Sequence, residues 1–115
     1  MPPAHVFDSN RMEWGAHERF PYIKAKVLES RATHLWASMM VVQLAVDGVI
    51  EPHIHERETE TAFILAGQAV LMHGDEQSTL TAGMGASIPP GTLHSLRNTG
   101  EIPLELIAIH MPPVR

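Results

Sequence analysis

Glycine and proline interrupt the second half of the chain at such short intervals that no long helix fits there. They stand at Gly48, Pro52, Gly67, Gly74, Gly83, Gly85, Pro89, Pro90, Gly91, Gly100 and Pro103. Both residues favour turns and weaken helices, so each tends to end a regular element. The runs between them have strand character, and we predict strands over 61–66, 69–73, 86–88, 94–97 and 104–110. Many short strands at regular spacing are typical of an all-β sandwich or barrel.

The segment 22–47 allows two interpretations. It contains neither glycine nor proline, and its apolar residues recur at helical spacing. Against a helix, Ile23, Ala25 and Val27 alternate with lysines, and 39–46 is rich in β-branched residues, which favours two strands joined near 29–33. The local pattern by itself leaves both interpretations open.

Composition bounds the classes of function. A chain of 115 residues fits one domain, and the absence of cysteine excludes disulfides, thiolate metal sites and cysteine nucleophiles. The net charge is -5 and the basic residues are scattered, so nucleic acid is not an expected partner. The start of the chain lacks the pattern of a signal peptide, and no long apolar run is present. We expect a cytoplasmic protein that does not bind membranes.

Two histidines, His53 and His55, are separated by one residue. In a strand, alternate side chains share a face, so both imidazoles are expected to project from one side about 7 Å apart along the backbone. Glu60 opens the next apolar run, and His94 starts another strand after the turn 89–91. Three imidazoles and one carboxylate suit a divalent transition metal: manganese, iron, nickel, copper or zinc. Taken alone, the pair of histidines with its charged neighbours also fits a solvated hairpin tip.

The spacing of these residues resembles the two signature motifs of the cupin superfamily. Residues 48–67 follow the first motif, G(X)5HXH(X)3-4E(X)6G, except that Gly48 lies one residue closer to His53 than the motif requires. Residues 83–98 match the second motif, G(X)5PXG(X)2H(X)3N, at every specified position. The chain is therefore identified as a member of the cupin superfamily, similar to its small single-domain bacterial members.

The resemblance implies an all-β fold, the RmlC-like jelly-roll barrel also called a double-stranded β-helix. It implies a metal inside the barrel, held by His53, His55, Glu60 and His94. It also favours two strands over a helix in 22–47.

The same resemblance divides the chain into an N-terminal arm, residues 1–21, and one barrel domain, residues 22–115. Small cupins commonly form homodimers through sheet edges and exchanged N-terminal strands, so a homodimer is expected. Trp14, Phe20 and Tyr22 would then anchor the arm on a surface.

Two further polar residues lie within apolar sequence and are weak candidates for catalysis. His110 ends the run 104–110, where it is expected either to act as a base or substrate contact beside the metal or to lie at the barrel rim. Gln43 is flanked by apolar residues and is expected to point at the pocket. Asn98 is expected to have a structural hydrogen-bonding role. The histidines expected to face solvent are His5, His17 and His34.

Four protein ligands leave two positions on a six-coordinate metal for water, dioxygen or a bidentate substrate. The expected function is therefore a metal-dependent enzyme acting on a small oxygen-containing molecule that chelates the metal, with dioxygenase-like oxidoreductase chemistry as the first expectation. The alternatives are a sugar isomerase or lyase, and a barrel that binds or senses a small ligand without catalysis.

Overall fold

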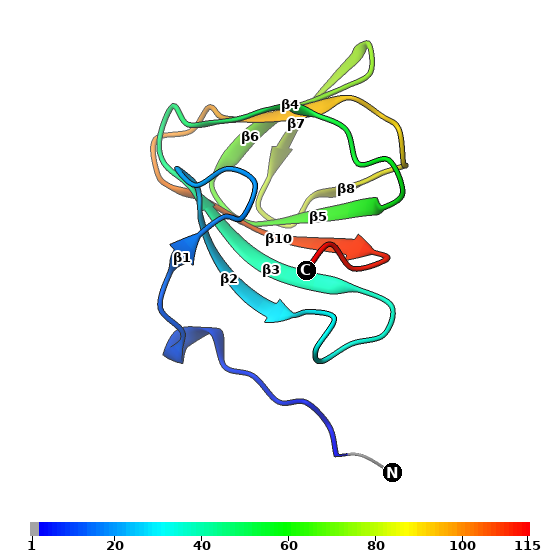
Figure 1. Cartoon of the computed structure of the whole chain (residues 1–115). Coiled ribbons are helices and arrows are strands. Elements are labelled where there is room, and N and C mark those ends of the chain that lie inside the picture. Colours follow the sequence, from blue (N-terminus) through cyan, green and yellow to red (C-terminus); the bar gives the residue numbers. More distant parts are fainter. Residues whose placement is uncertain (1–2) are drawn as a thin grey trace.

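Two antiparallel β-sheets packed face to face form the body of the protein (Figure 1). The computed structural model describes residues 3–115, so the first two residues of the expected arm lie outside the described residues. A short 3-10 turn, η1, covers Ser9–Arg11. The strands are β1 Gly15–Ala16, β2 Lys24–Glu29, β3 Ser38–Leu44, β4 Val49–His53, β5 Thr59–Ala66, β6 Gln68–His73, β7 Glu76–Thr81, β8 Gly85–Ile88, β9 His94–Asn98 and β10 Leu104–Met111.

The strand order shows how distant segments meet. One sheet has six strands in the order β1-β2-β3-β10-β5-β8, and the other has four in the order β4-β9-β6-β7. Because β4 and β5 follow each other in the chain but belong to opposite sheets, the segment between them crosses the gap. The all-β jelly-roll arrangement is thereby confirmed. Among residues 3–115 no helix is long and apolar enough to span a membrane.

The segment 22–47 forms two strands, β2 and β3, as the second interpretation expected. Its alternating residues explain why: Ile23, Ala25, Met40 and Val42 are buried between the sheets, whereas Lys24 faces outward. The helical spacing of its apolar residues is overridden because tertiary pairing with β10 satisfies the backbone of β3.

Two strands were not expected from the sequence: the two-residue β1, which lies in the expected arm, and β7. The strand β7, Glu76–Thr81, is mostly polar because it lies at the edge of the four-stranded sheet, where only Leu80 is buried. Alternation of apolar and polar residues is the main signal for a strand, and β7 carries almost none of it.

Two glycines of the motifs occupy turns with positive φ. Gly67, with φ +93°, joins β5 to β6, and a Cβ there would lie 3.1 Å from the Leu104 Cα. Gly91, with φ +82°, ends the turn before β9 and donates its N–H to the His55 carbonyl oxygen. Both positions require a residue tolerant of positive φ.

The core fills the space between the sheets. Strand β10 shows the alternation clearly, because Leu104, Leu106, Ala108 and His110 point inward while their neighbours are more exposed. Asn98 is fully buried, and its side-chain amide donates to the carbonyl oxygens of Leu44 and Ile102. These hydrogen bonds connect the loop after β9 to the end of β3, which is the structural role expected for Asn98.

From β1 onward the N-terminal segment lies against the chain's own barrel, whereas the part before η1 extends below β2 and away from the sheets (Figure 1). Strand β1 pairs with β2, and the Lys26 Nζ lies 4.4 Å from the centre of a Trp14 ring. The Tyr22 hydroxyl donates to the Val49 carbonyl oxygen at 2.9 Å. Phe20 packs against the core, so residues 17–20 cover one end of the space between the sheets.

Candidate metal centre

Two cross-strand pairs face each other across the gap between the sheets. His53 of β4 is paired with His94 of β9, and Glu60 of β5 is paired with His110 of β10. Partners in an antiparallel pair point to the same side of their sheet, so each pair projects inward as a unit. A slip of one residue in either register would turn the side chains of the displaced strand outward.

His55 joins the cluster from the crossing segment. It was expected in a strand with His53, but β4 ends at His53 and His55 lies in the loop that follows. The two imidazoles still converge, with ring centres 4.9 Å apart and planes at 90°. The period of a strand therefore does not explain their convergence; the turn that carries the chain to the other sheet does.

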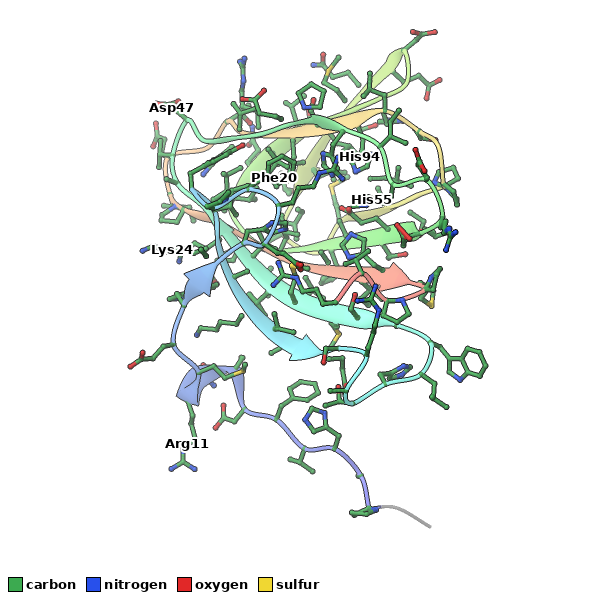
Figure 2. All side chains as sticks on the ribbon, in the orientation of Figure 1. Arg11, Phe20, Lys24, Asp47, His55 and His94 are labelled. Atoms are coloured by element: carbon green, nitrogen blue, oxygen red, sulfur yellow. The ribbon has the colours of Figure 1, made fainter. Side chains whose placement is uncertain are left out.

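One ligand atom from each of His53, His55, Glu60 and His94 lies within 4.8 Å of the other three. The Glu60 Oε1 is 3.1 Å from the His55 Nε2 and 3.6 Å from the His94 Nε2. Figure 2 shows the side chains of His55 and His94 pointing into the space between the sheets. The four residues expected to hold a metal thus form one cluster that is able to do so.

The backbone fixes which nitrogen of two imidazoles faces the cluster. The Nδ1 of His53 donates to the Glu51 carbonyl oxygen at 2.8 Å, and the Nδ1 of His94 donates to the Thr92 carbonyl oxygen at 2.9 Å. A neutral imidazole protonated at Nδ1 presents a lone pair at Nε2, and metal-binding histidines are commonly oriented in this way. The Nε2 of His94 is buried and has no hydrogen-bond partner within the described part of the chain. These observations fit a bound metal ion.

The electrostatics of the cluster favour an ionised Glu60 carboxylate and a neutral His53 imidazole. Burial lowers the pKa of His53 to about 4, so this ring is neutral at pH 7. Burial alone would raise the pKa of Glu60, but hydrogen bonds from His110 and His55 outweigh it and hold that pKa well below its usual range. Burial also disfavours protonated His94, yet the nearby Glu60 carboxylate raises its pKa. A metal ion would compete with that proton for the Nε2.

The two weak candidates for catalysis, His110 and Gln43, lie in different places: His110 contacts the cluster and Gln43 does not. His110 is buried, not at the rim, and its Nε2 lies 2.9 Å from the Glu60 Oε1. An ionised carboxylate only accepts, so the Nε2 carries the proton and the buried Nδ1 is left without a hydrogen-bond partner. Gln43, in contrast, lies on the opposite face of β3 and donates to the Glu105 Oε1 at 3.0 Å. The expectation that Gln43 points at the pocket is wrong, because Met40 and Val42 are the β3 residues that line it.

A cavity of about 260 Å³ adjoins the cluster. Its apolar wall comes from Phe20, Met40, Val42, Ile50, Leu106, Ala108 and Val114. Its polar and charged lining, besides His53, His55, Glu60 and His110, consists of His17, Glu18, Arg19 and Arg115. The cavity thus combines an aliphatic wall, the candidate metal ligands and two arginines.

Sequence analysis missed the cavity residues that precede β2 and follow β10. His17 was expected to face solvent, but it lines the cavity, and its Nδ1 accepts the backbone N–H groups of Arg19 and Phe20. Burial, together with the charge of Arg115, lowers the pKa of His17 to about 4. Arg19 and Arg115 lie outside regular strands, so neither motif spacing nor periodicity gave a signal for them.

Comparison with known proteins shows the family and supports the fold. The family model described as "Cupin domain" matches residues 40–110, more than half of the chain. Mannose-1-phosphate guanylyltransferase of Salmonella muenchen is 32% identical over 103 residues, which is 88% of this chain and 21% of that protein. Germin-like protein 5-1 of Oryza sativa subsp. japonica is 37% identical over 81 residues, 64% of this chain and 35% of that protein. The chain thus spans much less than two thirds of these relatives.

Among solved structures, a predicted oxalate decarboxylase from Thermotoga maritima aligns with a TM-score of 0.84 and 24% identity. The alignment covers 93% of this chain and 98% of the other. At this identity the likeness establishes the shared fold.

Proposed function

This chain belongs to the cupin domain family, and we propose that it is a metal-dependent enzyme acting on a small oxygen-containing molecule that chelates the metal. The observation that carries the proposal is the orientation of His53 and His94. Backbone carbonyls hold both Nδ1 protons, so both Nε2 atoms are directed at a cation position beside the Glu60 carboxylate. The adjoining cavity gives a substrate access to that point.

The ligand set indicates the class of chemistry. A bound divalent metal would supply Lewis acidity to a substrate oxygen and, in the case of iron, a centre for dioxygen chemistry. His53, His55, Glu60 and His94 would hold it. Three imidazole nitrogens and one carboxylate do not select one metal among manganese, iron, nickel, zinc and copper, because affinity and cellular supply both contribute.

The surrounding residues have their own roles. Leu106, Ala108 and Ile50 form an aliphatic wall that excludes bulk water and so strengthens electrostatic interactions inside the cavity. His110 donates to Glu60 and orients its carboxylate, which makes His110 a positioning residue. Its free Nδ1 is a hydrogen-bond acceptor on the same side of β10 as the cavity.

Dioxygenase-like oxidation is the reaction that we test first. The protein is loaded anaerobically with each metal in turn, and oxygen uptake is measured with diketones, catechols, oxalate and thiols. Substrate-dependent uptake supports an oxygenase, whereas conversion of a substrate without uptake supports an isomerase or lyase. If no compound reacts but one raises the melting temperature, the enzyme proposal is rejected in favour of a binding barrel.

A separate prediction tests the ligands themselves. We expect His55→Ala to lose most of the metal that the unmodified protein retains after dialysis, measured by elemental analysis, since three ligands hold a cation less firmly than four. His5→Ala is the matched control, because His5 is exposed on the N-terminal segment and belongs to no such cluster. Equal metal content in the two variants would remove His55 from the ligand set.

A further inference from the structure

The cavity beside the candidate metal centre carries two arginines that the ligand set does not use. Arg115 lies at one wall with only 14% of its side chain exposed, and its Nη2 is buried without a hydrogen-bond partner among residues 3–115. Its Nε lies 3.4 Å from the Glu18 Oε2, but Glu18 is 68% exposed at the mouth. A buried guanidinium nitrogen without an acceptor costs free energy unless a ligand supplies one.

The second arginine, Arg19, lines the same cavity from the segment that precedes β2, whereas Arg115 follows β10. Arg19 lies 5.7 Å from the centre of the Phe20 ring, and Phe20 in turn stacks edge-on against His53 at 5.1 Å. The Arg19 Nη1 has one long contact, 3.4 Å, to the Ile54 carbonyl oxygen. Its positive charge acts on the pKa of His94, which places it within electrostatic reach of the ligand cluster.

The charges of the lining residues indicate that the cavity with a bound metal ion would lack negative charge. Arg19 and Arg115 balance the carboxylates of Glu18 and Glu60, and His17 is neutral at pH 7 because its pKa is about 4. Among the side chains that line the cavity, a divalent metal ion would therefore leave two positive charges uncompensated beside the aliphatic wall. Such a cavity favours an anionic ligand over a neutral one.

The third polar group is a hydrogen-bond donor. The Nδ1 of His17 accepts two backbone N–H groups, so the neutral ring carries its proton at Nε2. An oxyanion in the cavity would thus have two guanidinium groups and one imidazole N–H available. Guanidinium groups bind carboxylates through two parallel hydrogen bonds, which adds geometric selectivity to the charge.

We propose that the cavity binds a small aliphatic 2-hydroxy or 2-oxo carboxylate, with Arg115 and Arg19 receiving the carboxylate at the end of the molecule that faces the mouth. This inference rests on the proposed function: the C2 oxygen and one carboxylate oxygen of the ligand would reach the metal, and the other carboxylate oxygen would face the arginines. The volume of about 260 Å³ equals roughly nine water molecules at about 30 Å³ each, which limits the ligand to a small molecule. Its alkyl group would pack on Leu106, Ala108 and Val114.

The test compares an acid with its neutral amide in the manganese-loaded protein. The probes are 2-hydroxyisovalerate and 2-hydroxyisovaleramide, which have the same shape and differ in charge, and binding is measured by titration calorimetry. We expect the acid to bind at least tenfold more tightly than the amide. We expect Arg115→Met to weaken binding of the acid about tenfold, to leave binding of the amide unchanged and to leave the metal content unchanged.

Arg97→Met is the matched control, because Arg97 is exposed on β9 and does not line the cavity. It should bind both probes as the unmodified protein does. If Arg115→Met does not fold, Arg19→Met carries the same comparison, since the Arg19 side chain is exposed and its loss leaves no buried gap. Equal affinity for acid and amide, or equal binding by the Arg115 and Arg97 variants, would overturn the inference.

The metal-free protein separates this inference from the proposed function. If no metal is retained, the proposed function fails, yet acid binding that depends on Arg115 in the metal-free protein still supports the anion site. If metal is retained and the acid has no advantage over the amide, the anion site fails while the metal centre stands.

Discussion

At the scale of single residues, the site depends on which imidazoles stay neutral. Burial lowers the pKa of both His17 and His53 to about 4, each ring being fixed by a hydrogen bond between its Nδ1 and the backbone. A neutral ring keeps a lone pair for a cation or an N–H for an anion. A protonated ring at either position would add positive charge to a partly buried space and would compete with metal binding.

This arrangement predicts a pH dependence of folding in the metal-free protein. The unfolded chain takes up a proton on His17 near pH 6.5, whereas the folded chain takes it up only near pH 4. Because the unfolded state binds more protons in that window, the free energy of unfolding should fall as pH decreases from about 6.5 to 4, and it should not change from this cause above that range. The groups that act on His17 besides burial are Arg115, His110, Glu60 and His53.

The variant His17→Gln isolates this contribution, since a glutamine amide oxygen can still accept a backbone N–H. The slope of unfolding free energy against pH gives the number of protons taken up on unfolding. We expect this number, measured by urea denaturation between pH 4 and 6.5, to be smaller in the variant by up to about one. The remaining slope includes His53, whose pKa is also lowered to about 4. An unchanged slope would show that His17 is not held neutral in the folded protein.

At the scale of elements, the edge strand β8 links one sheet to the ligands. It pairs with β5 next to Glu60 and continues into the turn 89–91 that leads to His94. Gly85 begins this strand, and a Cβ there would overlap the Ala62 carbonyl oxygen and lie 3.3 Å from the Phe63 Cα. Both are backbone atoms of β5, so only a displacement of one strand relative to the other would relieve the overlap.

We therefore expect Gly85→Ala to lower the free energy of unfolding by about 2 kcal/mol, within the usual range for overpacking. Gly15→Ala is the control: Gly15 also lies in an edge strand, but a Cβ there would meet only the Ala25 carbonyl oxygen at 3.8 Å. Urea denaturation of both variants measures the difference. Equal free energies of unfolding for the two variants would show that β8 can shift relative to β5 without loss of stability.

At the scale of the whole molecule, the candidate ligands connect the two sheets. His53 and His94 belong to the four-stranded sheet, Glu60 belongs to the six-stranded sheet, and His55 lies on the segment between them. A metal ion bound by all four residues would bridge the halves of the barrel. Unfolding separates these sheets, so a ligand that binds only the folded protein must stabilise the whole fold.

Metal loading should accordingly raise the melting temperature. At a free metal concentration one hundred times the Kd, the gain is about 2.7 kcal/mol. For a domain of this size that corresponds to a shift of roughly 10 °C or more. Calorimetry of the metal-free and loaded protein measures it, with His5→Ala expected to show the full shift and His55→Ala little of it. Equal shifts in both variants would assign the stabilisation to another site.

The homodimer suggested by the family resemblance stays a prediction at this scale. Phe63, Leu65 and Met84 are more than 40% exposed on or beside the six-stranded sheet. Light scattering checks the prediction, since a dimer would have twice the chain mass of 12.7 kDa.

The sequence by itself determined an all-β sandwich or barrel with its turns, and its resemblance to the cupin motifs implied the jelly roll and the four residues of the cluster. The spacing of His53, His55, Glu60 and His94 is tied to glycines and prolines that fix short turns, so the motif carries both the ligands and the geometry that brings them together. The turns at Gly67 and Gly91 are encoded by the glycines themselves, because positive φ is a local property of the backbone.

Only the tertiary structure decided what surrounds that cluster. His110 and Glu60 meet because β10 pairs with β5 in one register, and the sequence separation of 50 residues hides that register. The choice between helix and strands in 22–47 was likewise a matter of pairing with distant strands. His17, Arg19 and Arg115 enter the cavity from segments outside regular strands, where no periodicity directs a side chain. Local turns are encoded by neighbouring residues, whereas a cavity wall is assembled from contacts that no short stretch of sequence contains.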